Sequence, residues 1–244
     1  GCPRLLTLRQ ILGYAPKHRR AMWIRMTEPV HYETTTEPPV HPYLLGILLG
    51  DGTPRSDGVS VSSASQEILA RIGRVLPDGH TLRKTATAGY DYRITAGSVA
   101  PRLQARRLTL AAKLRDLGLL GRSSATKFIP RIYRYGSLAT RWSVLRGLLD
   151  SDGWVDQRGQ PNLDTTGEQL AIDLREVVES LGGSCYLSLK RQVGSYVSRK
   201  TGERVLCKPV WRLRIRMEDA RDCFALSCKR QRASKRAKKV TRRF

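Results

Sequence analysis

The feature that most constrains the fold of this chain is an internal repeat that begins near residue 43. Adding 101 to the residue number places Gly46 on Gly147 and Asp51 on Asp152 without gaps. The same shift aligns Gly52 with Gly153, Gly58 with Gly159, Glu67 with Glu168, Leu69 with Leu170, Ala70 with Ala171 and Arg74 with Arg175. A period of about 100 residues is too long for a solenoid. We therefore expect two similar half-domains related by a pseudo-twofold axis.

Each half is expected to contain the same succession of helices and strands. Apolar runs predict helices, and alternating stretches such as residues 59–62 and 90–94 predict strands. The expected helices, the later one in each half started by a Ser or Thr cap, are residues 42–49, 65–76, 141–149 and 166–181. In the second half, long strands at 185–192 and 206–216 flank a polar loop at 194–202. This order predicts an α+β fold of two αββαββα half-domains.

The composition along the chain suggests further divisions. A basic patch at residues 17–20 precedes the stretch 34–39, whose paired prolines forbid helix and favour an extended linker. The expected divisions are a lead segment and linker at 1–39, a first half-domain at 40–140, a second half-domain at 141–232 and a basic tail at 233–244.

The charge of the chain points to a polyanionic partner. Lys and Arg total 44 against 21 Asp and Glu, a formal net charge of +23. No basic amphipathic anchor flanked by aromatics is evident, so nucleic acid is favoured over an anionic membrane surface. No apolar run approaches the roughly 18 residues of a membrane span, and no signal peptide is recognisable. The five cysteines contain no CxxC pair and predict reduced thiols. We expect a soluble, cytoplasmic, DNA-associated protein.

Two segments carry the chemistry, residues 44–52 and 145–153. Each is expected as a helix with a small residue midway and an acid at its C-terminal end. Gly46 and Gly147 would let the two helix backbones approach closely, with leucines filling the seam. Asp51 and Asp152 would then meet at the end of the seam, where the helix dipoles and their mutual repulsion disfavour them. A divalent cation removes both penalties, and oxygen ligands suit Mg²⁺.

These segments resemble the LAGLIDADG homing endonuclease family. The second, Leu-Arg-Gly-Leu-Leu-Asp-Ser-Asp-Gly, is close to the family signature, and the first fits its looser form with Leu49 in place of an earlier, non-catalytic acid. The resemblance covers roughly residues 40–230. The residues that it implies as ligands of the catalytic metal are Asp51 and Asp152, with Gly50 and Ser151 beside them.

The resemblance also implies what the whole molecule does. It implies a saddle of antiparallel sheets over double-stranded DNA, built by a monomer with pseudo-twofold symmetry. It implies a double-strand break in a long target by Mg²⁺-dependent hydrolysis, leaving 3′ overhangs, with Mn²⁺ or Ca²⁺ able to occupy the site in vitro. Two alternatives keep the same core: an RNA-binding intron maturase, and a non-catalytic DNA-binding regulator. The metal-binding acids are often dispensable in maturases and tend to be lost in such regulators, whereas this chain has Asp51 and Asp152.

The intein-borne branch of the family carries a Lys-x-Ile-Pro block before the second motif, and here it occupies residues 127–130. The resemblance therefore implies an active-site role for Lys127 and an intein-derived origin, although no splicing blocks are present. From Asp51 to Lys127 is 127 − 51 = 76 residues, and the same step from Asp152 ends one residue before Lys229. We expect Lys229 to be the symmetry mate, with each lysine near one scissile phosphate; simple phosphate contact is the alternative.

Specificity is expected from strand residues that point to one face of each sheet and reach the major groove. The candidates are Arg55, Ser60, Ser62, Arg83, Lys84, Thr85, Tyr92 and Arg93 in the first half, and Gln157, Gln160, Lys190, Gln192, Arg204, Arg212 and Arg214 in the second. From Lys229 onward, a basic helix or arm that includes Arg230 and Arg232 is expected to follow phosphates without reading sequence.

Overall fold

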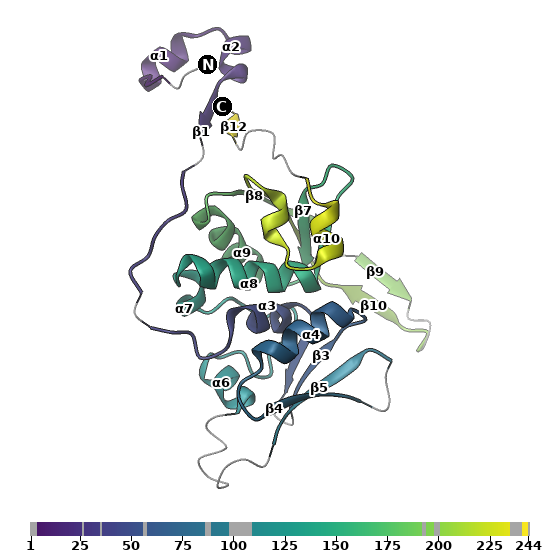
Figure 1. The fold of residues 1–244 in the computed structure, drawn as a ribbon. Helices are drawn as coiled ribbons and strands as arrows, with labels where there is room; N and C mark the ends of the chain where they lie inside the picture. Colours follow the sequence, from purple (N-terminus) through teal and green to yellow (C-terminus); the bar gives the residue numbers. More distant parts are fainter. Residues whose placement is uncertain are drawn as a thin grey trace.

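A computed structural model describes residues 4–25, 27–34, 36–55, 58–85, 89–97, 109–191, 194–197, 201–234 and 241–243. Gln192, predicted to contact DNA, lies outside these residues, as do residues 235–240 of the basic tail. The molecule contains two four-stranded antiparallel sheets on either side of a central pair of helices (Figure 1). None of the helices described is long and apolar enough to cross a lipid bilayer.

The first half follows the expected order of elements. Its elements are α3 (Pro42–Gly50), β2 (Gly52–Arg55), β3 (Gly58–Ser62), α4 (Gln66–Val75), β4 (His80–Lys84), β5 (Asp91–Ala96) and α6 (Leu110–Asp116). The strands pair antiparallel in the order β2-β3-β5-β4. Ser65 caps α4 as predicted, since its hydroxyl accepts from the Ile68 amide.

The second half repeats this arrangement after the short helix α7 (Arg131–Arg134). Its elements are α8 (Leu138–Ser151), β6 (Gly153–Val155), β7 (Pro161–Thr165), α9 (Glu168–Ser180), β8 (Ser184–Arg191), β11 (Val210–Arg216), the 3-10 helix η1 (Ala220–Cys223) and α10 (Ser227–Arg232). The sheet order is β6-β7-β11-β8, the equivalent of the first sheet. The predicted α+β fold with two αββαββα units is therefore confirmed.

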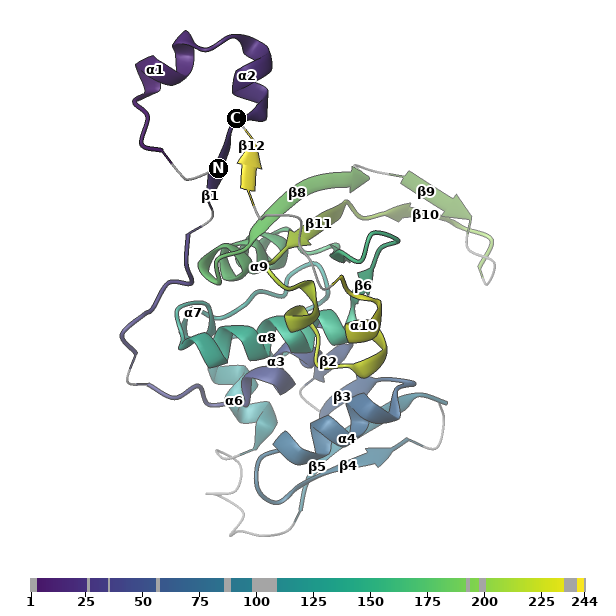
Figure 2. The same cartoon turned by 45° about the horizontal axis from the view of Figure 1, so that its top comes forward.

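Three local expectations are corrected. The helix predicted from residue 141 begins at Leu138, because the Ser137 hydroxyl accepts from the Thr140 amide. The helix predicted from residue 166 begins after Gly167, which offers no side chain, so the expected Ser or Thr cap is absent. The loop predicted at 194–202 contains β9 (Gly194–Val197), which pairs with β10 (Arg204–Cys207) as a ribbon that extends the second sheet outward (Figure 2).

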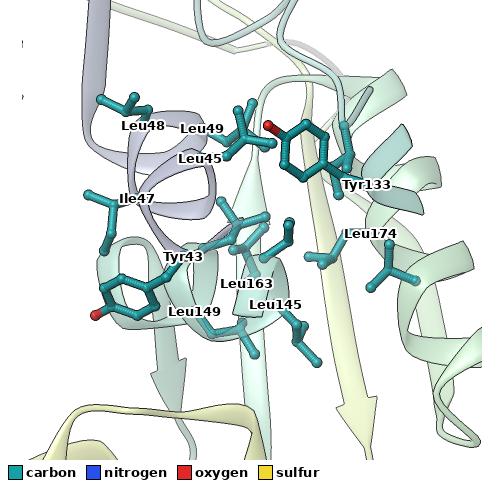
Figure 3. Close-up of a cluster of buried hydrophobic side chains, with 14 of the residues drawn as sticks. Tyr43, Leu45, Ile47, Leu48, Leu49, Tyr133, Leu145, Leu149, Leu163 and Leu174 are labelled. Atoms are coloured by element: carbon teal, nitrogen blue, oxygen red, sulfur yellow. The ribbon is translucent and has the colours of Figure 1, made fainter. Parts of the chain in front are cut away.

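The two halves share one hydrophobic core. Every residue from Tyr43 to Leu49 is buried, so α3 is surrounded by protein on all sides, as expected for a helix without a polar face. It lies against α8, and Figure 3 shows Leu45 and Leu49 of α3 among Leu145 and other residues of the second half. A core that continues across the seam fixes the two repeats relative to each other.

The lead segment and the tail lie at one end of the molecule. The lead segment contains α1 (Leu8–Gly13), α2 (Pro16–Ala21) and β1 (Trp23–Arg25), and β1 pairs antiparallel with β12 (Thr241–Arg243) of the tail (Figure 1). The chain then runs along the second half, where the Val30 amide donates to the Ser180 carbonyl at 2.9 Å. The fully buried Arg141 contacts Val30, Ser180 and the Tyr32 ring. The stretch just before the predicted linker is thus packed against the second half, whereas Thr34, Thr36, Glu37 and Pro39 of the linker itself are exposed.

Candidate active site at the helix seam

The two motif helices touch through their central glycines. A Cβ atom on Gly46 would lie 2.4 Å from the Val144 carbonyl oxygen and 2.9 Å from the Gly147 Cα. A Cβ atom on Gly147 would lie 2.2 Å from the Tyr43 carbonyl oxygen. These neighbours are backbone atoms, which cannot move aside as the end of a flexible side chain can. The predicted close approach of Gly46 and Gly147 is confirmed, and it brings the helix ends together.

Two carboxyl groups meet at the end of this seam. Asp51 terminates α3 and Asp152 terminates α8, and the two carboxyl groups lie close enough for each to affect the pKa of the other. A Cβ atom on Gly50 would lie 3.2 Å from the Asp152 carboxyl carbon. Desolvation, followed by the neighbouring Asp51 charge, raises the pKa of Asp152 to about 6, and desolvation also raises the pKa of Asp51. Protein atoms lie close to the Asp152 carboxyl, but the residue as a whole is exposed to solvent.

Lys127 lies beneath the end of α3 and is 4% exposed. Its Nζ donates to the carbonyl oxygens of Leu48 at 2.9 Å, Leu49 at 2.9 Å, Gly50 at 3.1 Å and Gly52 at 2.8 Å. These carbonyls have no partner within the helix, because they belong to its last turn and the residues beyond. The ammonium group therefore satisfies the end of α3 and opposes the negative end of the helix dipole.

Lys229 repeats this arrangement at the end of α8. Its Nζ donates to the carbonyl oxygens of Leu149 at 2.8 Å, Asp150 at 2.6 Å, Ser151 at 3.5 Å and Gly153 at 2.6 Å. Each of these four acceptors is the residue that the 101-residue shift assigns to an acceptor of Lys127. Lys229 thus occupies the position that the repeat indicates, although it lies one residue further along the chain than an ungapped alignment requires.

The geometry of both lysines differs from contact with a phosphate. An ammonium group has three donors, and each of these two faces four backbone acceptors. Burial lowers the pKa of Lys127 and of Lys229, while the nearby Asp51 and Asp152 charges oppose this shift. The sequence pattern identified the two lysines but not their partners. Every residue has a backbone carbonyl, so the sequence does not distinguish those that accept from a lysine.

The paired carboxylates suit a divalent cation with oxygen ligands. Desolvation raises both pKa values, and at Asp152 the neighbouring Asp51 charge adds to it; a cation would compensate both effects. The Gly50 and Ser151 carbonyls, predicted as further ligands, already accept from the lysines but each keeps a second lone pair. Across the described residues no group of three His, Cys, Asp or Glu side chains could hold a metal. Further ligands would therefore be backbone oxygens, water or the substrate.

Asp150 is a buried acid for which sequence reasoning proposed no separate role. It is 1% exposed, and its Oδ2 accepts from the Tyr43 hydroxyl at 2.9 Å. Its Oδ1 accepts from the amides of Ala225 at 3.2 Å and Leu226 at 3.1 Å. Desolvation raises the pKa of this carboxyl group. The first repeat has Leu49 here, so Asp150 has no mate, and it attaches the segment that leads to Lys229 to α8.

The strand register divides the first sheet into two faces. Val59 and Ile94 are buried against the core, so the residues that alternate with them point away. The predicted readers on this open face are Arg55, Ser60, Ser62, Arg83 and Arg93. Tyr92 pairs with the buried Val61 and packs against the core, and Lys84 pairs with Tyr92 on the same side. Tyr92 and Lys84 thus lie on the other side of the sheet from the five residues above, since side chains alternate along a strand, and Lys84 is exposed there.

The open face of the second sheet carries an organised polar cluster. Asp164 accepts two hydrogen bonds from Arg212, both at 2.7 Å, and one from Lys190 at 2.8 Å. The Arg212 guanidinium also lies 5.3 Å from the Trp154 ring centroid. Arg214 lies on the same face, with its guanidinium 6.0 Å from the ring centroid of Tyr186. Asp164, Trp154 and Tyr186 were missed, although strict alternation along β6, β7 and β8 would have placed them there.

The remaining predicted contacts lie away from the centres of the two sheets. They are Thr85 just beyond β4, Gln157 and Gln160 between β6 and β7, Arg204 on the β9–β10 ribbon, and Arg230 and Arg232 on α10. Gln157 and Gln160 line the same surface hollow as Arg212. Arg230 forms a 3.6 Å ion pair with Asp222, so its guanidinium is turned toward η1. Arg232 is exposed.

Comparison with known proteins adds a relative and a set of similar structures. No family model matches the chain. A replicative DNA helicase DnaB of Mycobacterium intracellulare is 36% identical over 155 residues, which is 64% of this chain and 21% of the helicase. The chain thus spans about a fifth of the length of that relative.

Solved structures similar to the chain include those of the homing endonuclease I-DmoI. Mesophilic variants of it are 12% identical, cover 74% of this chain and 89% of theirs, and give a TM-score of 0.43. The complex with DNA and Ca is 14% identical and covers 74% and 84%, also at 0.43. The complex with DNA and Mn is 15% identical and covers 73% and 89%, again at 0.43. At such scores the fold class rests on the chain's own elements, two αββαββα units.

Proposed function

We propose that this chain is a site-specific DNA endonuclease of the LAGLIDADG homing type, which makes a double-strand break by metal-dependent hydrolysis. The observation that carries the proposal is the meeting of Asp51 and Asp152, one from each repeat, at the end of the helix seam. The net charge of +23 supports a polyanionic substrate. The open faces of the two sheets supply polar side chains that suit the major groove.

The chemistry follows from the residues at the seam. A divalent cation supplies an activated water, charge neutralisation on the phosphoryl group and stabilisation of the leaving oxygen. Asp51 and Asp152 hold the cation and set its position relative to the phosphates. Lys127 and Lys229 are active-site members that keep the two helix ends in place, so we assign them a role through the aspartates rather than by phosphate contact.

One acid from each half at a shared centre suits two cuts on opposite strands. The pseudo-twofold axis between the repeats would coincide with the local twofold axis of the duplex. The cuts would lie across the minor groove and leave 3′ overhangs. Because the single chain already contains both halves, a monomer is sufficient, and Mg²⁺ is the proposed ion. We also propose an intein-derived origin and an intracellular, DNA-associated location.

The helicase relative suggests where the target lies. The sequence has no Gly-x4-Gly-Lys-Ser/Thr loop. The similarity to the helicase therefore does not include this nucleotide-binding motif. The matched part is 21% of the relative's length. We propose that this part is a nuclease segment carried inside the helicase, and that the target is the helicase coding sequence from which that segment has been removed.

The test is cleavage of a plasmid that carries the rejoined helicase sequence. With Mg²⁺ the protein should linearise this plasmid, and with a chelator it should not. Asp51→Asn and Asp152→Asn should each lose double-strand cleavage, by at least about a hundredfold, because each removes a metal ligand. Their DNA affinity should stay within a few-fold, since the sheets supply most of the binding surface. Asp116→Asn, at an exposed acid on α6, is the matched control and should cut normally.

The two alternatives predict other outcomes. A maturase would bind its intron RNA more tightly than duplex DNA, and a regulator would bind DNA without cutting it in any metal. Full cleavage by Asp51→Asn or Asp152→Asn would disprove the site assignment. Loss of folding in both variants, measured by circular dichroism, would mean that these aspartates only terminate helices.

A further inference from the structure

Each lysine at the seam is carried by a short segment, and the one that leads to Lys229 is attached to α8 of its own repeat by Asp150. Lys229 lies on α10, a helix of six residues with no buried residue and no side-chain cap. Lys127 lies between α6 and α7, where no regular element runs. Since each lysine supports the end of a motif helix, whatever holds these two segments also sets the position of the catalytic carboxylates.

The segment of Lys229 is also held by α4, which belongs to the other repeat. The Glu67 carboxylate accepts from the Ser227 amide at 3.1 Å and from the Ser227 hydroxyl at 3.1 Å. Arg71, one turn further along α4, donates to the Ala225 carbonyl at 2.7 Å and to Glu67 at 3.0 Å. These hydrogen bonds join the first half to residues 225–227, immediately before Lys229.

The segment of Lys127 is held in the same sense by α9 of the second repeat. The Asp173 carboxylate is 1% exposed and accepts from the Ile129 amide at 2.8 Å. Arg134 at 3.0 Å and Gln169 at 2.8 Å also contact Asp173 and fix its orientation. Both lysine segments are therefore clamped by the second helix of the opposite repeat.

The two clamps are not copies inherited from the duplication. Under the 101-residue shift, Arg71 corresponds to Ile172, which is exposed, and Asp173 corresponds to Ile72, which is fully buried. One clamp is a surface carboxylate with an arginine, and the other is a buried carboxylate. Different side chains, at positions that the repeat does not relate, each hold a lysine segment in place. This indicates that the contacts serve the lysine segments and are not a remnant of the duplication.

We propose that Glu67 with Arg71, and Asp173, are positioning residues of the nuclease centre, each acting across the seam on the lysine of the opposite repeat. Glu67 and Arg71 fix Lys229 and through it the end of α8 at Asp152. Asp173 fixes Lys127 and through it the end of α3 at Asp51. Each half of the molecule therefore controls the catalytic side chain that the other half contributes. Cleavage of either strand at the full rate then requires both halves to be in place. This inference rests on the proposed nuclease function.

The experiment measures each strand separately. A duplex of the rejoined helicase sequence is labelled on one strand at a time, and single-turnover cleavage is followed with Mg²⁺. Glu67→Ala should slow one strand about tenfold to a hundredfold more than the other, because small displacements of a reacting group cost rates of this size. Asp173→Asn should slow the opposite strand. DNA affinity should change less than about threefold in either variant, since neither residue lies on an open sheet face.

Matched variants separate positioning from general stability. Glu168→Ala alters the equivalent position on α9, and Glu179→Ala removes an ion pair of the same spacing as Glu67 with Arg71. Both should leave the ratio of the two strand rates unchanged. Glu67→Gln keeps one acceptor for Ser227 and should recover part of the rate. Because Glu67 is near the surface, Glu67→Ala is the variant that decides if Asp173→Asn fails to fold.

A second readout does not depend on cleavage. Hydrogen exchange of the amides at 225–230 should be faster in Glu67→Ala than in the parent protein, while that of Glu168→Ala should match the parent. If the parent cuts DNA but Glu67→Ala cuts both strands at the parental ratio, or its exchange is unchanged, the positioning role is overturned. If the parent cuts neither strand while the exchange responds, the clamp stands and the nuclease function is what fails.

Discussion

A proton and the proposed metal ion compete for the two carboxyl groups at the seam. Because the pKa of Asp152 is raised to about 6, metal binding near or below that pH must displace a proton. We therefore predict that the affinity for Mn²⁺ falls about tenfold for each pH unit below about 6 and is nearly constant above about pH 7. Calorimetric titration of the protein with Mn²⁺ between about pH 5 and pH 8 measures this.

The same shift has a consequence for stability. A carboxyl group whose pKa is higher in the folded than in the unfolded state binds its proton more tightly when folded. Without metal, the free energy of unfolding should therefore fall as the pH rises from the ordinary value of 3.8 to about 6, and saturating Mn²⁺ should remove this fall. Asp152→Asn serves as the control, since it has no such group. An Mn²⁺ affinity that does not vary with pH would argue against the carboxylate pair as the metal site.

At the scale of residues, the sequence patterns identified side chains whose position follows from their neighbours in sequence or from the repeat. Asp51 and Asp152 follow apolar helices at a fixed place in the repeat, and spacing alone led to Lys229. Side chains whose role depends on a partner far away in the sequence were not found. Asp150 meets amides 75 and 76 residues away, and Glu67 meets Ser227 at a separation of 160 residues. No local pattern records such distances.

At the scale of elements, the packing of α3 on α8 depends on the absence of two side chains. We predict that Gly46→Ala and Gly147→Ala each destabilise the protein by about 1–3 kcal/mol, because the added methyl would press on backbone 2.2–2.4 Å away. Urea denaturation measures the change. Gly73→Ala on α4 is the control, since its Cβ would meet nothing within 4 Å. It should stabilise the protein by about 0.5–1 kcal/mol. Neutral effects at Gly46 and Gly147 would contradict the close approach.

The elements themselves were predictable where one periodicity dominates. The helix that became α3 is apolar throughout, and α4 has a serine cap at its start, so both were recognised close to their true bounds. Strand β9 lies in the stretch 194–202 that was read as a polar loop, and the strand predicted at 206–216 is divided between the end of β10 and β11. The strands of the β9–β10 ribbon exist because β8 and β11 are already paired, and the pairing continues outward along the chain. This information comes from the register of a sheet and not from local composition.

At the scale of the whole molecule, the two ends of the chain carry a large share of the positive charge. Neither residues 1–27 nor residues 223–244 contain an Asp or Glu, and together they hold 15 of the 44 Lys and Arg residues. Pairing of β1 with β12 joins residues 23–25 of the lead segment to residues 241–243, while Lys229 lies at the seam. The basic tail was expected from its composition, but the strand that joins it to the lead segment was not, because the paired residues lie more than 200 positions apart.

This joining leads to a prediction about binding to DNA of any sequence. Deleting residues 235–244 should weaken binding to all duplexes alike and flatten the dependence of log affinity on log salt by about 0.9 for each phosphate that is no longer neutralised. Deleting residues 1–26 should act in the same direction. Because each deletion leaves β1 or β12 without its partner strand, the two effects should not add, and the double deletion should cost less than their sum.

Fluorescence anisotropy with one duplex that carries the rejoined helicase sequence and one that does not, at several salt concentrations, measures all three variants. Strict additivity would show that the two ends bind independently, and a weakening confined to the first duplex would show that they read bases rather than phosphates.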